Sequence, residues 1–110
     1  MKLEEFEIEV LKIMINSRLT SDNWLDFLSN YKVSGYEYTG CGYYINVISE
    51  KIELKNEVIS GPFLIGEIGG LQMGFVIYIE DNSITIECHS WGIENLPENI
   101  RKLNVKLFLE

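Results

Sequence analysis

Three side chains in this sequence could carry out nucleophilic or metal chemistry: Cys41, Cys88 and the one histidine, His89. Cys88 and His89 are neighbours in an alternating stretch that reads as a β-strand, so their side chains point to opposite faces. They therefore cannot chelate one metal ion together, and we expect Cys88 to be buried. Cys41 could act as a nucleophile with His89 as its base only if the turn at Gly40 and Gly42 lies beside the strand of His89.

No motif in the sequence completes an enzyme site around these side chains. A zinc site needs about four Cys or His ligands, or three with a water molecule, and the chain offers too few. No loop has the alternating Asp and Asn residues of a calcium site. The glycine pair at 69–70 is not followed by the lysine and hydroxyl residue of a phosphate-binding loop. We therefore expect a protein without catalysis, metal or cofactor.

The acidic residues are a stronger lead to function. The formal net charge is −8, and no Lys or Arg occurs between Asn56 and Ile100. Direct binding to nucleic acid or to an anionic membrane needs basic patches, so this balance argues against both. A surface of one sign instead steers basic partners toward it. An acidic surface that serves only solubility is equally compatible with the composition.

The stretch from Pro62 to Gly92 must position these acids, and it reads as a three-stranded antiparallel meander. Asp81 and Asn82 form a two-residue turn signal between the alternating runs GFVIYIE and SITIECH. This turn predicts that Glu80 lies opposite Ser83, and the register sorts the side chains into an apolar and a polar face. The polar face consists of Val76, Tyr78, Glu80, Ser83, Thr85, Glu87 and His89.

A second turn is predicted at the glycine pair 69–70. It places Leu64 opposite Phe75 and adds Glu67 to the polar face of the meander. The two turns are independent, and both assign the apolar residues to the same buried face. Agreement between them is stronger evidence than either turn alone.

Two helices are predicted before the meander. Residues 2–16 contain a helical apolar stripe, although positions 6–10 also alternate as in a strand, and the continuous run of good helix formers favours the helix. A second helix is predicted to begin at Thr20 or Ser21, whose hydroxyl group can cap the first turn.

The remaining elements are shorter. Residues 35–49 read as two strands around Cys41, and the flanking glycines indicate a tight turn or bulge where backbone or ligand comes close. A short strand is predicted at 57–60, one helical turn at 97–100 and a last strand at 104–110.

Together these elements predict an α+β fold in one domain, residues 1–110. Two N-terminal helices within residues 1–32 pack on an antiparallel, mainly meander β-sheet of about five or six strands within residues 36–110. No apolar run reaches the roughly 20 residues that a membrane span requires, and the N-terminus carries acids where a secretory signal would be basic and then apolar. We expect a cytoplasmic protein with two free thiols.

Three short motifs resemble those of a known family. Gly40-Cys-Gly-Tyr43, Gly74-Phe-Val76 and Glu87-Cys-His-Ser-Trp-Gly92 are similar to stretches of small bacterial immunity proteins. These are the antidotes of polymorphic toxins, including those of contact-dependent growth inhibition, and the resemblance spans Tyr36 to the C-terminus. It implies a non-enzymatic cytoplasmic protein that binds one toxin domain tightly and blocks it. Such toxins are often nucleases, whose basic clefts attract acidic inhibitors.

We therefore expect a cognate toxin domain of basic charge as the partner. The acids would supply charge complementarity, Tyr78 an anchor, and His89 a hydrogen-bonding or pH-sensitive edge. The candidate contact residues are Glu67, Tyr78, Glu80, Asp81, Glu87 and His89.

Three alternatives remain open at this point. The first is a self-associating domain that pairs through an exposed sheet edge or its Tyr-rich strand. The second is a small-molecule binding module with a pocket near Gly40, Gly42 and Trp91. The third is a thiol enzyme built on Cys41.

Overall fold

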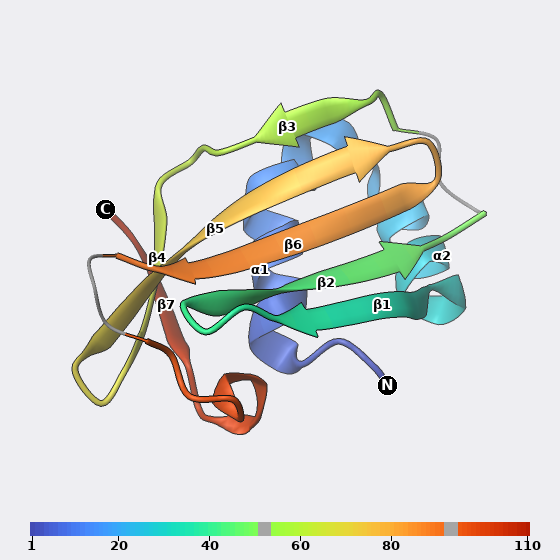
Figure 1. Ribbon diagram of the computed structural model, residues 1–110. Coiled ribbons are helices and arrows are strands. Elements are labelled where there is room, and N and C mark those ends of the chain that lie inside the picture. Colours follow the sequence, from blue (N-terminus) through green and yellow to red (C-terminus); the bar gives the residue numbers. More distant parts are fainter. Residues whose placement is uncertain (51–53, 92–94) are drawn as a thin grey trace.

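The computed structural model describes residues 1–50, 54–91 and 95–110. Two α-helices, α1 (Glu5–Ile15) and α2 (Ser21–Asn30), precede seven described strands. The strands are β1 (Lys32–Tyr38), β2 (Gly42–Ile48), β3 (Glu57–Ile59), β4 (Leu64–Ile68), β5 (Leu71–Glu80), β6 (Ser83–Ser90) and β7 (Lys106–Leu109). Short 3-10 helices occur at η1 (Asn16–Arg18) and η2 (Ile100–Lys102). The predicted α+β fold is confirmed, with both helices on one face of the sheet (Figure 1).

The start of each helix follows from its sequence. In α1 the carboxylate of Glu7 accepts the backbone N–H of Glu4 at 2.7 Å, which satisfies one of the free donors at the helix start. In α2 the hydroxyl oxygen of Thr20 accepts the N–H of Asn23 at 3.2 Å, as the predicted cap requires. The helical reading of residues 2–16 is therefore confirmed over the strand-like alternation.

The sheet has the order β1-β2-β6-β5-β4-β7, and β3 pairs with the far end of β5. The turn at Asp81 and Asn82 gives the predicted register, with Glu80 opposite Ser83 and Phe75 opposite Cys88. The turn signal in the sequence therefore predicted the register of the β5–β6 hairpin correctly. The β2–β6 and β4–β7 pairings join segments that are distant in the sequence, and no local signal reveals them.

The β4–β5 hairpin is shorter than predicted. Its ladder reaches only to Gly66 opposite Met73, and Leu64 pairs with Leu109 of β7. The predicted pairing of Leu64 with Phe75 is therefore wrong. Farther along this edge of β5, residues 77–79 pair with β3 instead.

Two boundaries also differ from the prediction. Strand β1 begins at Lys32 rather than at 36, because α2 ends at Asn30 and the backbone of Tyr31 is already extended. The turn after Pro97 becomes helical at Ile100–Lys102 rather than at 97–100. Gly92 lies outside the described residues.

Gly42 allows an unusually close approach of two strands. A Cβ atom at this position would lie 1.8 Å from the carbonyl oxygen of Cys88 on β6, so only glycine fits here. Gly40 adopts a φ of +90°, which an L side chain rarely tolerates. The predicted tight turn around Cys41, where backbone comes close, is confirmed.

The core lies between the two helices and the face of the sheet that they cover. On the sheet side it includes Tyr43, Ile45, Phe75, Ile77, Ile79, Ile84, Ile86 and Cys88, all buried. The helices contribute mainly Phe6, Val10, Leu11, Met14, Trp24 and Phe27. The opposite face of the sheet, here called the outer face, is not covered by either helix (Figure 1).

One ion pair lies inside this otherwise apolar layer. Glu7 of α1 is fully buried, and both of its carboxylate oxygens accept hydrogen bonds of 2.7 Å from the guanidinium group of Arg101. The phenol of Tyr43 on β2 donates a third bond to Glu7 at 2.6 Å, and burial raises the pKa of Tyr43. Arg101 also donates to the carbonyl of Lys2 at 2.7 Å and lies 5.6 Å from the ring centroid of Tyr36. These contacts join α1, η2, β1 and β2 at one point.

Removal of one partner from this pair should destabilise the protein strongly. We expect Arg101→Met to lower the free energy of unfolding by about 3–5 kcal/mol, because the charge of Glu7 would stay buried without compensation. Urea unfolding followed by circular dichroism measures this loss. The double variant Glu7→Gln/Arg101→Met should recover most of the lost free energy of unfolding. Arg18→Met, which breaks an exposed ion pair, should lower the free energy of unfolding far less. Equal losses for Arg18→Met and Arg101→Met would contradict a structural role of the buried pair.

Candidate functional site

The outer face of the sheet is a polar surface that crosses several strands. Residues opposite each other in the ladders share a face, so the register places Tyr44, Glu87 and Val76 in one row and Asn46, Thr85 and Tyr78 in the next. Glu37 on β1 continues the first row, because it lies opposite Tyr44. Strands β2, β5 and β6 contain no Lys or Arg, so the centre of this face has negative charge only.

Glu87 lies at the centre of this surface and is held from both sides. The phenol of Tyr78 on β5 donates to one of its carboxylate oxygens at 2.6 Å, and the phenol of Tyr44 on β2 donates to the other at 3.2 Å. The carboxylate is half-buried, and its orientation is set by two side chains on the flanking strands. A charge fixed in this way is preorganised for a partner, which reduces the ordering cost of binding.

A second set of hydrogen bonds lies beside this one. The amide of Asn46 on β2 donates to the hydroxyl oxygen of Thr85 at 2.7 Å, and the hydroxyl of Ser34 contacts the amide oxygen of Asn46. The two sets of side-chain hydrogen bonds together span β1, β2, β6 and β5. Rigid polar surfaces of this kind present a constant pattern of donors and acceptors to a partner.

The six predicted contact residues do not form one compact cluster. Tyr78, Glu80 and Glu87 lie together near the β5–β6 hairpin, and Asp81 occupies the turn with a φ of 54°. Glu67 lies opposite Gln72 of β5. Gln72 is eight residues before Glu80 on the same strand, so the two positions are about 26 Å apart along it.

Glu67 and His89 have different surroundings. The amide of Gln72 donates to Glu67 at 3.3 Å, and Lys106 of β7 is the residue opposite Glu67 in the ladder. His89 is half-buried and lies opposite Gly42 and Gly74. Glu67 therefore has a basic residue opposite it in the ladder, whereas Glu80 and Glu87 lie on β5 and β6, two strands that contain no Lys or Arg.

Sequence reasoning missed two members of this surface, Glu37 and Tyr44. Both belong to the β1–β2 hairpin, and their proximity to Glu87 depends on the β2–β6 pairing, which has no local sequence signal. Tyr44 alternates with the buried residues Tyr43 and Ile45, and this pattern in the sequence indicates that Tyr44 faces outward. The pattern does not show which strand lies beside β2.

Cys41 meets one geometric condition for a thiol enzyme. Its turn does lie beside β6, since the N–H of Ser90 donates to the carbonyl of Cys41 at 2.7 Å. Its thiol lies 3.7 Å from the hydroxyl oxygen of Thr39, a partner that is no general base. Cys88 is buried on the opposite face, and this burial raises the pKa of its thiol. Among the described residues, no three His, Cys, Asp or Glu side chains come together as a metal site would require.

An aromatic corner lies at the other end of the outer face. Phe63 and Trp91 are both partly exposed, and their ring centroids are 5.3 Å apart. The indole lies over Gly74, where a Cβ atom would come within 2.6 Å of its nitrogen. A cavity of about 170 Å³ beside them is lined by Ser60, Phe63, Leu64, Gly74, Phe75, Val76, His89 and Trp91. This volume is below the roughly 300 Å³ of typical ligand sites, and Cys41 does not line the cavity.

Comparison of the chain with protein families, with curated proteins and with solved structures gives no match. In the described part of the chain, neither α-helix has the length and apolar character that crossing a membrane requires.

The hydrogen bond from Tyr78 to Glu87 should appear in the pH dependence of stability. This bond, together with partial burial, raises the pKa of Tyr78 to about 12 from its ordinary value near 10. The neutral phenol is favoured in the folded state, so its contribution is complete below about pH 10 and is lost as the pH rises through about 12.

Tyr78→Phe removes this titration and provides the test. We expect wild type to be more stable than Tyr78→Phe near neutral pH, and the difference to shrink as the pH rises from about 10 to about 12. Urea unfolding of both proteins at several alkaline pH values measures the two curves. A difference that stays constant over the whole interval would show that Tyr78 is not coupled to Glu87.

Proposed function

We propose that this chain is an immunity protein that binds and neutralises a cognate bacterial toxin domain, without catalysis, through the outer face of its sheet. The observation that carries the proposal is the central carboxylate of Glu87, fixed by Tyr44 and Tyr78 on strands β2, β5 and β6, which contain no Lys or Arg. An arrangement of this kind is suited to meet a complementary positive charge with little loss of side-chain freedom.

The surrounding residues support a protein partner rather than a small ligand. Glu37 and Glu80 are exposed and extend the negative charge on either side of Glu87. The two tyrosines contribute large rigid rings that keep a polar tip, which is typical of interface anchors. A basic domain such as a nuclease, with a cleft shaped for polyanions, would be complementary to this surface.

The fold leaves this face available for binding. Both helices cover the opposite face, and the core is complete without any contact on the outer face (Figure 1). Binding there would therefore require no rearrangement of the packed layers. Charge at this face would mainly set the rate of association and its salt dependence.

The direct test uses the reading frame immediately upstream of the one that encodes this chain. Its product should arrest the growth of a bacterial host, and co-expression of this chain should restore growth. Titration calorimetry with the purified products at two salt concentrations should show a tight complex that weakens as the salt concentration rises. Absence of both growth rescue and complex would overturn the proposal.

Charge reversal on the outer face tests the mechanism separately. Glu80→Lys/Glu87→Lys should weaken binding to the basic partner by about tenfold or more and should flatten its salt dependence, because attraction becomes repulsion. The matched control is Asp22→Lys/Asp26→Lys, which changes the net charge equally on α2, a helix that packs on the other face. Equal weakening by both variants would exclude the outer face as the interface.

Self-association through β1 is the second candidate function. Most of this strand is exposed, and it forms the edge of the sheet beyond β2 among the residues that the structure describes. Edge strands offer unpaired backbone groups to a second copy. A sedimentation profile of a monomer at all concentrations would remove this candidate.

A further inference from the structure

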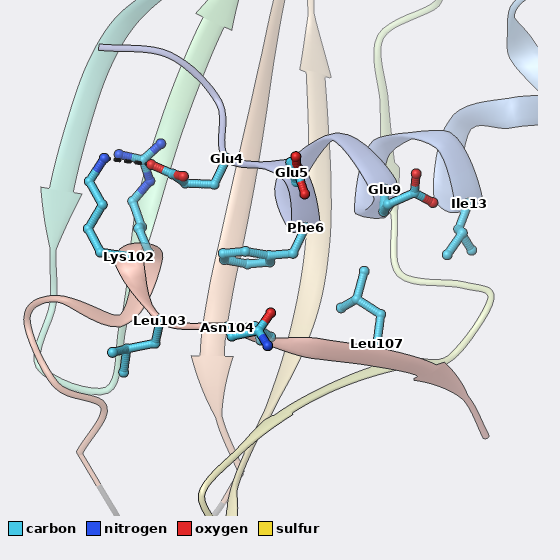
Figure 2. Close-up of a pocket in the computed structure, with 11 residues that line it drawn as sticks. Glu4, Glu5, Phe6, Glu9, Ile13, Lys102, Leu103, Asn104 and Leu107 are labelled. Atoms are coloured by element: carbon cyan, nitrogen blue, oxygen red, sulfur yellow. Dashed lines mark hydrogen bonds and ion pairs between the residues drawn. The ribbon is translucent and has the colours of Figure 1, made fainter.

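A groove on the helix side of the molecule separates α1 from the last strand. Its volume is about 660 Å³, within the range of roughly 300–1,000 Å³ typical of ligand sites. One wall is the start of α1 and the other is the segment from η2 to β7 (Figure 2). It is lined by Glu4, Glu5, Phe6, Glu9, Ile13, Arg101, Lys102, Leu103, Asn104, Val105 and Leu107.

The walls of this groove are fixed at one end. Arg101 is held by the buried Glu7, and Lys102 pairs with Glu4 at 2.6 Å, as the dashed line in Figure 2 marks. Both basic residues of the lining are thus already compensated. Glu5 and Glu9 are both exposed on α1, and Glu9 lies 3.7 Å from the ammonium group of Lys12 in an exposed pair within the helix. Because an exposed pair of this kind contributes little, the rim keeps an excess of negative charge.

The floor of the groove is apolar. Figure 2 shows Phe6 between the two walls, Ile13 on α1 and Leu107 on β7. Lysine and arginine side chains have long aliphatic stems and a charged head, so they match an apolar floor with an acidic rim. The lining therefore favours a basic occupant with extended side chains.

The backbone of β7 offers a second mode of recognition. The N–H of Glu110 donates to the carbonyl of Phe63, and hydrogen-bonding residues alternate along an antiparallel ladder. The backbone groups of Lys106 and Phe108 therefore point to β4, whereas those of Leu107 and Leu109 point to the free edge. Strand β7 ends the sheet order among the described residues, so this edge can accept an added strand.

The spacing of Glu5 and Glu9 matches the spacing of alternate side chains on an added strand. Glu5 and Glu9 are one turn apart on α1, a rise of about 6 Å along the helix axis. Alternate residues of a strand point to one face and are about 6.6 Å apart. Because α1 and β7 run in the same general direction along the groove (Figure 2), two alternate basic residues of a strand on β7 could reach the two carboxylates.

We propose that this groove binds an extended peptide segment with Lys or Arg at alternate positions, which adds a strand to the free edge of β7 and pairs with Glu5 and Glu9. This surface is distinct from the outer face, and the inference does not rest on the proposed function. A second copy of the chain is a poorer occupant, because its own β7 would bring Leu107 and Leu109 to the acidic rim instead of bases.

The test uses a synthetic peptide in which lysine alternates with threonine, a residue that favours extended structure. Titration calorimetry should show binding to the full chain. A peptide of the same composition with its lysines grouped at one end should bind about tenfold more weakly, since its charges no longer match the spacing of Glu5 and Glu9. Equal binding of the two peptides would overturn the proposal.

Two protein variants separate the charge contribution from the backbone contribution. Glu5→Gln/Glu9→Gln should weaken binding of the alternating peptide about tenfold, while Asp22→Asn/Asp26→Asn, which removes the same charge on α2, should leave it nearly unchanged. Leu109→Pro removes an N–H from the free edge without breaking a bond to β4, and it should weaken binding about fivefold. Unchanged affinity in either groove variant would contradict the assigned mode.

Amide hydrogen exchange gives a readout that does not depend on substitution. Addition of the alternating peptide should slow exchange at Leu107 and Leu109, whereas Lys106 and Phe108 are already protected by β4. Binding without new protection at Leu107 and Leu109 would overturn strand addition. Self-association that Leu109→Pro abolishes in sedimentation would assign the edge to a second copy and overturn the basic peptide.

Discussion

The buried contact between Glu7 and Arg101 is the constraint on which the rest of this structure depends. It joins the first helix to the segment that leads into the last strand, and Tyr43 connects both to the centre of the sheet. A carboxylate inside an apolar core is tolerable only if all its lone pairs are used, and here four donors from three residues use them. The pair therefore specifies one position of α1 on the sheet.

Several acids on the helix side of the sheet are held differently from Glu87 on the outer face. On the helix side, Glu7 is neutralised by Arg101, Glu4 by Lys102 and Glu57 by Arg18. On the outer face, Glu87 is oriented only by neutral phenols, which leaves its charge uncompensated. A glutamate that is paired with a base thus has a structural role, whereas a glutamate without such a partner is available for recognition. This contrast is why the outer face, rather than the acidic composition as a whole, is the basis of the proposed function.

The features that local chemistry encodes were predictable from the sequence. Asp81 and Asn82 set the hairpin register, Thr20 set the start of α2, and the alternation of Cys88 and His89 set their opposite faces. The placement of β2 beside β6 was not predictable, because it depends on packing between distant segments. For the same reason Glu37 and Tyr44 were missed as members of the outer face, and a glutamate at position 7 gave no sign of burial.

The distance in sequence between Glu7 and Arg101 also bears on how the chain folds. The two are separated by 94 positions, so Glu7 emerges from the ribosome long before its partner. Until Arg101 has been synthesised, α1 cannot dock fully without burying an uncompensated charge, which costs several kcal/mol. The hairpins β1–β2 and β5–β6 need only local closure and can form earlier. Stable docking of the first helix on the sheet thus waits until the segment around Arg101 has been made.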